Sequence, residues 1–175
     1  MMGVEVIDEH PYEINPVRQE SAWILDFGVL LPADGLTERE TLAERFADAF
    51  RAAWLGECES DAFNGLVVRA GLRWDQVVLI RAYSRYLRQI GSALGQDYIQ
   101  QTMLSNVQIS SLLVKLFEVQ FAPGEFQVAE RETQAGVIVS QIEAALNEVR
   151  SLDQDRIFRS FLSLIRATLR TNAYA

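Results

Sequence analysis

Few residues of this 175-residue chain are of the kinds that carry out acid-base or nucleophilic chemistry. It has one histidine (His10), one cysteine (Cys58) and one lysine (Lys115). Single copies argue against most transition-metal sites and most Ser-His or Cys-His catalytic arrangements. Glu57 and Glu59 flank Cys58 and are expected to raise its pKa, which would make the thiol a poor nucleophile. Lys115 falls off the apolar stripe of its expected helix, so we expect it to be solvated.

Carboxylates are far more numerous than any other reactive group. They gather in four clusters: Asp8/Glu9, Glu38/Glu40, Glu57/Glu59/Asp61 and Asp153/Asp155. Most of these stand at helix starts or in turns, where an acid complements the helix dipole. Asp8 and Glu9 lie beside His10, but neighbours on a strand point to opposite faces. We therefore interpret the acids as solvated surface and predict no metal site, because such a site needs three or four converging ligands.

The ten glycines do not form a phosphate-binding motif. Neither G-x-G-x-x-G nor a Walker loop occurs, and both require a strand before the glycines and a helix after them. GSALG (Gly91–Gly95) falls between two expected helices. We interpret it as a turn.

RAGLRWDQVVLIRAYSRYLRQIG (Arg69–Gly91) could suggest a surface for nucleic acid or an anionic ligand. Basic and aromatic residues alternate in it: Arg81, Tyr83, Arg85, Tyr86 and Arg88. On a helix the tyrosines fall mainly on the apolar face, whereas the arginines recur at i, i+4 and i+7 on another. We favour a core face plus a solvated or salt-bridged face, the latter set against the acidic segment before residue 62.

The charge of the chain argues against nucleic acid and anionic membranes as partners. Formal net charge is −8, and residues 1–62 alone hold 14 acids and 4 bases. Nucleic-acid affinity rests on clustered lysine and arginine. We find no signal peptide and no apolar run of about 18 residues, the length that would suggest a membrane span. A single cysteine fits a reducing compartment, so we expect a cytoplasmic protein.

Two strands and a series of helices must position these residues. Val4–Glu9 and Ala22–Leu31 are predicted to be strands, paired antiparallel. Two strands alone are marginal in water. They would therefore pack on helices, complete a sheet in a partner, or form the end of a domain that lies upstream.

Helices are predicted from the stretch after PADG (Pro32–Gly35) onward. Thr37 and Glu40 have capping-box spacing, and the first helix has one apolar face: Leu42, Phe46, Ala49, Phe50 and Ala53. A short helix at 62–69 should end at Gly71. The long helix that follows carries Leu79, Tyr83, Tyr86, Leu87 and Ile90 on one face.

The C-terminal half continues this helical pattern. A short helix near residues 96–104 precedes a strongly amphipathic one with a stripe of Ile109, Leu112, Leu113, Leu116, Phe117 and Phe121. Glu130–Val149 and Leu152–Arg170 then form a helical hairpin. The second of these has two adjacent apolar faces, so we expect it to be buried on more than one side or to expose an interface. The prediction is a mainly α fold with a β segment at 1–33 and a helical domain at 34–175.

Three separated passages resemble a known family, the large-type bacterial NAD-specific glutamate dehydrogenases. AGLRWDQVVLIRAYSRYLRQIG with SSLLVKLFEVQFAP is similar to the helical region of that family. DEHPYEI with WILDFGVLLP resembles the end of an ACT-like regulatory region before it. IRATLRTNAY resembles the passage that closes the helical region ahead of the catalytic domain.

The resemblance implies that this chain is a non-catalytic segment of an enzyme that oxidises L-glutamate to 2-oxoglutarate by hydride transfer to NAD. The family's catalytic lysine, glutamate-binding block and dinucleotide fold would lie after Ala175. Its substrate block contains a GGLRW-like run, but AGLRW at Ala70–Trp74 joins two helices here. We therefore assign no catalytic, cofactor-binding or metal residue to this segment, and NAD is implied only for the whole enzyme.

Three functions remain open on the sequence. The first is a structural segment whose partners are the remaining domains of a homo-oligomeric dehydrogenase. The second is a self-contained helical module for protein-protein interaction. The third is a regulatory module that senses an amino acid, although two strands are too few for a complete ACT sheet.

Overall fold

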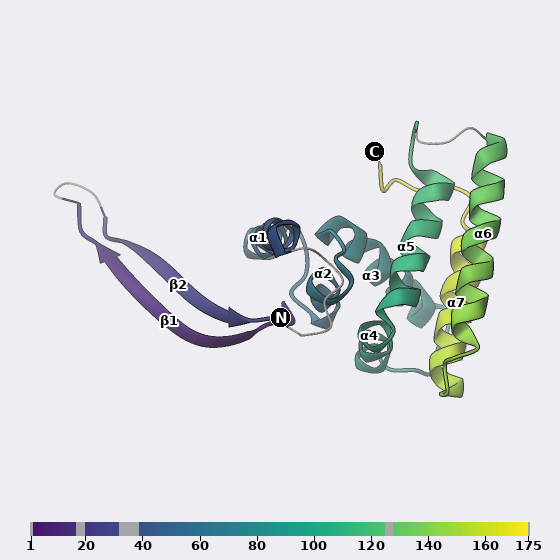
Figure 1. Cartoon of the computed structure of the whole chain (residues 1–175), viewed down its shortest axis with the longest axis horizontal. Helices are drawn as coiled ribbons and strands as arrows, with labels where there is room; N and C mark the ends of the chain where they lie inside the picture. Colours follow the sequence, from purple (N-terminus) through teal and green to yellow (C-terminus); the bar gives the residue numbers. More distant parts are fainter. Residues whose placement is uncertain (1, 17–19, 32–38, 125–127, 175) are drawn as a thin grey trace.

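The chain folds into a β-hairpin that stands away from a body of helices. A computed structural model describes residues 2–16, 20–31, 39–124 and 128–174. Figure 1 shows the hairpin as a curved arm joined at its base to the helices. The mainly α prediction with two strands at the N-terminus is confirmed.

The arm consists of β1 (Glu5–Ile14) and β2 (Ala22–Leu30), paired antiparallel as predicted. The register runs from Glu5 opposite Leu30 to Ile14 opposite Ala22, with an irregularity between Val6 and Asp8. β1 is longer than expected because it continues through Pro11. A strand with one neighbour tolerates proline, since its missing N–H can face the unpaired edge.

The base of the arm is fixed by the residues before β1. Met2 packs against the core, and Gly3 has a positive φ of 73°. A Cβ at Gly3 would lie 2.8 Å from Gly65 Cα. Only glycine permits this backbone angle and this close approach at no steric cost, so the N-terminal segment is held on the first turn of the second helix.

Helix α1 (Arg39–Trp54) lies at the edge of the body and contacts α2 and α3. The predicted cap at Thr37 lies outside the described residues. Leu42 and Ala49 are buried as expected, together with Ala52. Phe50, which the sequence placed on the buried face, is 47% exposed and stacks on Trp54. The reason is that α1 is covered on one narrow side only, so part of its wide apolar face remains in solvent.

The centre of the body is built from residues 62–121. A 3-10 turn (Ala62–Asn64) runs into α2 (Gly65–Ala70), which ends at Gly71 in the left-handed conformation, as predicted. The next three helices are α3 (Trp74–Gln89), α4 (Gln96–Ser105) and α5 (Val107–Phe121). Phe63, Leu66, Ile99, Met103 and Leu116 are completely buried among them.

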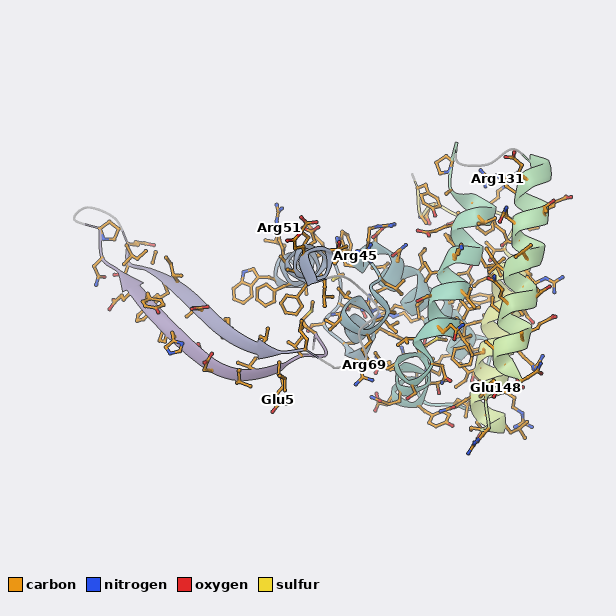
Figure 2. The ribbon with its side chains drawn as sticks, viewed as in Figure 1. Glu5, Arg45, Arg51, Arg69, Arg131 and Glu148 are labelled. Carbon is orange, nitrogen blue, oxygen red and sulfur yellow. The ribbon has the colours of Figure 1, made fainter. Side chains whose placement is uncertain are left out.

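The C-terminal pair is α6 (Val128–Leu146) and α7 (Leu152–Ala167), the predicted helical hairpin. Figure 1 shows α5, α6 and α7 running alongside one another. Arg131 at the start of α6 donates to the carbonyls of Val119, Gln120 and Ala122. These lie at the end of α5, where carbonyl groups lack helical partners, so Arg131 ties the two helices together (Figure 2).

The apolar faces of α7 are covered within the chain. Ile157, Phe158, Phe161, Leu162 and Ile165 are all at most 7% exposed. Helices α3, α4, α5 and α6 each contact α7. The expectation of burial on more than one side is therefore confirmed for α7, of whose apolar residues Leu152 is the markedly exposed one at 64%. Leu169, which the sequence also placed on these apolar faces, is 91% exposed because the helix ends at Ala167.

Among the described residues, none of the helices combines the length and apolar character that a membrane crossing requires.

Candidate functional site

The long helix α3 positions two groups of functional side chains, one polar and one aromatic. Its N-terminal turn follows the AGLRW stretch, in which Gly71 makes the turn and Leu72 is buried. Gln76 accepts from the Arg73 backbone N–H at 2.8 Å and donates to Glu118 of α5 at 2.7 Å. These bonds satisfy the helix start and tie it to α5. AGLRW therefore lies in a structural junction between two helices, as the sequence analysis interpreted it.

Arg81 is the centre of the polar group, and here the sequence prediction is partly wrong. It was placed on a solvated or salt-bridged face with Arg85 and Arg88, yet it is 4% exposed. Its Nε and Nη2 atoms donate to the two carboxylate oxygens of Asp61 at 2.7 and 2.8 Å. Nη2 also donates to Asn64 at 2.8 Å. Arg81 is buried because the 3-10 turn folds over α3 and brings these acceptors onto it.

Asp61 performs two tasks at this point. The same carboxylate that binds Arg81 accepts from the backbone N–H of Phe63 at 3.0 Å and caps the 3-10 turn. The Arg81 guanidinium also lies 5.9 Å from the centre of the Phe63 ring. Arg85 pairs with Glu59 in solvent. The expected pairing of α3 arginines with the acidic segment before residue 62 is thus confirmed for Arg81 and Arg85.

The aromatic group is centred on Tyr83, where α3 meets α5 and the end of α7. The Tyr83 hydroxyl lies 2.7 Å from Thr168 Oγ1, which itself donates to the Leu164 carbonyl at 2.8 Å. Either of these two hydroxyls can donate the first bond, because each carries one proton and two acceptor lone pairs. Burial raises the pKa of the Tyr83 phenol, and the hydrogen bond to Thr168 opposes that rise.

Aromatic rings continue this contact along the tail after α7. Phe117 lies edge-on to Tyr83 with ring centres 6.0 Å apart, and Tyr174 stacks on Phe117 with ring centres 6.3 Å apart. Such pairs each contribute about 0.5–1.5 kcal/mol beyond the area that they bury. The Tyr83–Thr168 hydrogen bond and the Phe117–Tyr174 ring contact therefore help to hold the segment after α7 on α3 and α5.

An open groove of about 500 Å³ runs beside these rings. Its apolar and aromatic lining includes Leu79, Tyr83, Tyr86, Phe117 and Leu164. Arg170 is the charged residue in that lining. Tyr86 is 50% exposed here, although the sequence placed it on the core face. Beyond Tyr83 the other helices cover only one side of α3, where Leu87 is buried as predicted. Tyr86 and Ile90, from the same predicted face, lie outside this cover, and Ile90 is 56% exposed.

The residues singled out for chemistry are not brought together. His10 lies exposed on β1 and Lys115 lies exposed on α5. Within the described ranges, no group of three or more histidine, cysteine, aspartate or glutamate residues is placed to hold a metal ion.

Cys58 is half-buried next to the Arg81 cluster. Its pKa is raised, as the sequence predicted, but chiefly by burial. Arg81 opposes the rise, while Asp61, Glu57 and Glu59 add to it. The sequence identified two of the smaller contributions and missed the largest, because burial depends on the fold of the loop after α1.

The geometry defines a helical unit that carries a β-hairpin arm and holds its own C-terminal segment in an aromatic contact. Three family models match parts of the chain. Glutamate dehydrogenase ACT3 domain matches residues 1–42, and glutamate dehydrogenase helical motif 3 matches residues 58–123. Bacterial NAD-glutamate dehydrogenase catalytic domain matches residues 141–175.

Similar proteins point the same way. The chain is 40% identical over 177 residues to an NAD-specific glutamate dehydrogenase of Halomonas elongata and 41% identical over 181 residues to one of Mycobacterium tuberculosis. A third, of Pseudomonas aeruginosa, is 39% identical over 175 residues. Each alignment covers 99% of this chain but only 10–11% of the relative. The chain belongs to the bacterial NAD-specific glutamate dehydrogenases and spans about a tenth of the length of these relatives. No solved structure matches it.

The three matches cover different parts of the structure, and one group of side-chain contacts joins two of these parts. The arm and the start of α1 fall in the ACT3 match. Tyr83 and Phe117 fall in the helical-motif match, whereas Thr168 and Tyr174 fall in the catalytic-domain match. The contact around Tyr83 and the groove beside it therefore join the last two regions. We call this contact the Tyr83 seam; it comprises Tyr83, Phe117, Thr168 and Tyr174.

Proposed function

We propose that this chain is a non-catalytic segment of an NAD-specific glutamate dehydrogenase, and that it sets the position of the catalytic domain relative to the regulatory region. The Tyr83 seam is the observation that carries the proposal. It holds the segment after α7, which the catalytic-domain match includes, on two helices of the helical motif.

The domain division that we propose follows from the change in local structure. Residues 1–33 would be the end of an ACT-like region, since the strands lie there. Residues 34–175 would be a helical domain whose last helices also begin the catalytic region, because α7 is buried against α3, α4 and α5. For the whole protein we propose a cytoplasmic, homo-oligomeric enzyme that oxidises L-glutamate with NAD, the reaction that the names of its relatives state.

The first test is turnover by the chain alone. We expect the purified 175-residue chain to show no NAD-dependent oxidation of glutamate, because we assign none of its residues to the binding of substrate or cofactor. Measurable turnover that scales with the concentration of the chain would contradict the proposal.

The second test addresses the seam in the full-length dehydrogenase. Tyr83→Phe removes only the hydroxyl that binds Thr168, and a neutral hydrogen bond of this kind stabilises by about 1 kcal/mol. We expect faster cleavage by protease around residues 168–174 and a lower kcat with an unchanged KM for NAD. Arg85→Gln, an exposed change on the same helix, serves as control. Equal behaviour of the two variants would show that the seam does not position the catalytic region.

A further inference from the structure

The last turn of α5 ends at a proline that leaves the carbonyl of a buried residue without its helical donor. In a continuing helix the carbonyl of Val119 would accept from the N–H four residues later. That residue is Pro123, which has no N–H. Ala122 before it is extended, with φ −62° and ψ 125°, so the helix cannot continue. Val119 and Ala122 are only 4% and 7% exposed. Because buried carbonyls need partners, a donor must come from elsewhere in the chain.

Arg131 in the first turn of α6 is that donor. Its Nη1 donates to the carbonyls of Val119 and Gln120 at 3.1 and 2.8 Å. Its Nη2 donates to the carbonyl of Ala122 at 2.6 Å. A guanidinium presents its N–H groups in one rigid plane, and a positive charge at the end of a helix complements the helix dipole. A single side chain therefore satisfies three carbonyls, including the one that Pro123 leaves without a partner. Figure 2 shows Arg131 between the end of α5 and the start of α6.

The turn that Arg131 stabilises carries a ring that supports the Tyr83 seam. The ring of Phe121 lies 4.9 Å from that of Phe117, measured between their centres. Phe117 is 2% exposed, and it also contacts the rings of Tyr83 and Tyr174. A helix end whose carbonyls lack partners frays. Fraying at Phe121 would remove one support of Phe117, and with it part of the contact that holds Tyr174.

Arg131 lies in neither of the matched regions that the seam joins. The helical-motif match ends at residue 123, and the catalytic-domain match begins at residue 141. We propose that Arg131 is a positioning residue of the Tyr83 seam. It replaces the N–H that Pro123 lacks, keeps the last turn of α5 helical, and so holds Phe117 against Tyr174. This effect on the seam does not depend on the proposed function, whereas an effect on turnover rests on it.

Two measurements on the 175-residue chain test the proposal: amide hydrogen exchange at residues 119–122, and the rate of trypsin cleavage after Arg170 in the segment that the seam holds. Arg131→Met keeps most of the length of the side chain and removes all its donors. We expect both rates to rise about tenfold, because hydrogen bonds to a charged group are among the stronger ones. Arg131→Lys keeps a charged donor at the helix end, so both rates should rise at most about threefold. Arg150→Gln, at an exposed position before α7, is the control and should change neither rate.

Two further variants separate the steps of the mechanism. Pro123→Ala supplies an N–H four residues after Val119 and lets the helix continue. In the Arg131→Met background it should bring exchange and cleavage back to within about threefold of the parent chain. Phe121→Leu removes the ring and leaves the carbonyls of the turn satisfied. It should speed cleavage after Arg170 about fivefold, with exchange at residues 119–122 changed less than about twofold.

The full-length dehydrogenase separates this proposal from the proposed function. There Arg131→Met should lower kcat by about threefold or more, with the KM for NAD unchanged, because the catalytic region is less well placed. Faster cleavage with an unchanged kcat would contradict the proposed function and would still support Arg131 as a residue of the seam.

Unchanged cleavage after Arg170 in a folded Arg131→Met chain would overturn the inference, and so would equal effects of Arg131→Met and Arg150→Gln. Failure of Pro123→Ala to restore either measurement would do the same. If circular dichroism shows that Arg131→Met unfolds the chain, Arg131→Lys and Phe121→Leu take its place. Cleavage that neither of these two variants speeds would then overturn the inference.

Discussion

The ion pair between Arg81 and Asp61 should be one of the most costly polar interactions to break in this chain. Arg81 is 4% exposed, and its guanidinium depends on the two Asp61 oxygens at 2.7 and 2.8 Å. Asp61→Asn keeps an oxygen that can still cap the 3-10 turn, so it removes mainly the negative charge. A buried pair that loses one partner is destabilised by about 3–5 kcal/mol, because the other charge is left uncompensated.

The Arg85–Glu59 pair provides a matched comparison from the same helix to the same loop. Its side chains are 58% and 48% exposed, and an exposed pair contributes about 0–1 kcal/mol. We therefore expect Asp61→Asn to cost roughly 3 kcal/mol and Arg85→Gln less than about 1 kcal/mol. The difference is large, since the total stability of a domain is about 5–15 kcal/mol.

Urea unfolding followed by circular dichroism measures both free energies of unfolding. Arg81→Met in the Asp61→Asn background removes the stranded charge and should recover part of the loss. The reasoning is refuted if Asp61→Asn and Arg85→Gln lower the free energy of unfolding equally. It is also refuted if the double variant loses as much stability as Asp61→Asn and Arg81→Met, measured singly, lose when added together.

Three further predictions concern the core, the base of the arm and the thiol. Phe161 is 1% exposed, so Phe161→Ala should lower the free energy of unfolding in urea by about 3–5 kcal/mol through the cavity that it leaves. Leu169 is 91% exposed, so Leu169→Ala should change that free energy by at most about 0.5 kcal/mol. Similar losses in the two variants would contradict the packing of α7. Gly3→Ala should loosen the arm, because φ is 73° and Gly65 Cα leaves no room; faster amide hydrogen exchange in β1 would show it, and unchanged exchange would count against the anchor. Burial raises the pKa of the Cys58 thiol, so the folded state holds the thiol proton more tightly than the unfolded state. The free energy of unfolding should therefore fall as the pH rises through the ordinary thiol range toward the pKa of the folded state. Alkylation of Cys58 at about pH 8 should be slower in the folded chain than in urea.

Local patterns were sufficient to predict most elements. The turn at Gly71, the stripe on α5 and the hairpin of α6 and α7 depend on spacing within one helix or on a single residue with special backbone freedom, and all three are confirmed. The antiparallel strands were equally visible from alternation and from the punctuating prolines.

The errors occur where a side chain's surroundings come from elements far away in the chain. Helical spacing grouped Arg81 with Arg85 and Arg88, but it could not show that the 3-10 turn would fold over Arg81 alone. The acidic run Glu57/Glu59/Asp61 was the available signal, and it predicted the partners without the burial. Spacing likewise put Phe50, Tyr86 and Ile90 on core faces, because an apolar stripe does not show how far the next helix extends along it.

By itself, the sequence determined the order of the elements, the absence of familiar phosphate and catalytic motifs, and the kinship with NAD-specific glutamate dehydrogenases, since these depend on residue types and short spacings. Only the tertiary structure decided that Arg81 is buried with Asp61 and that Thr168 and Tyr174 close on Tyr83 and Phe117. Each of these depends on which faces meet when the helices pack, a property of pairs of elements that no single stretch of the chain contains.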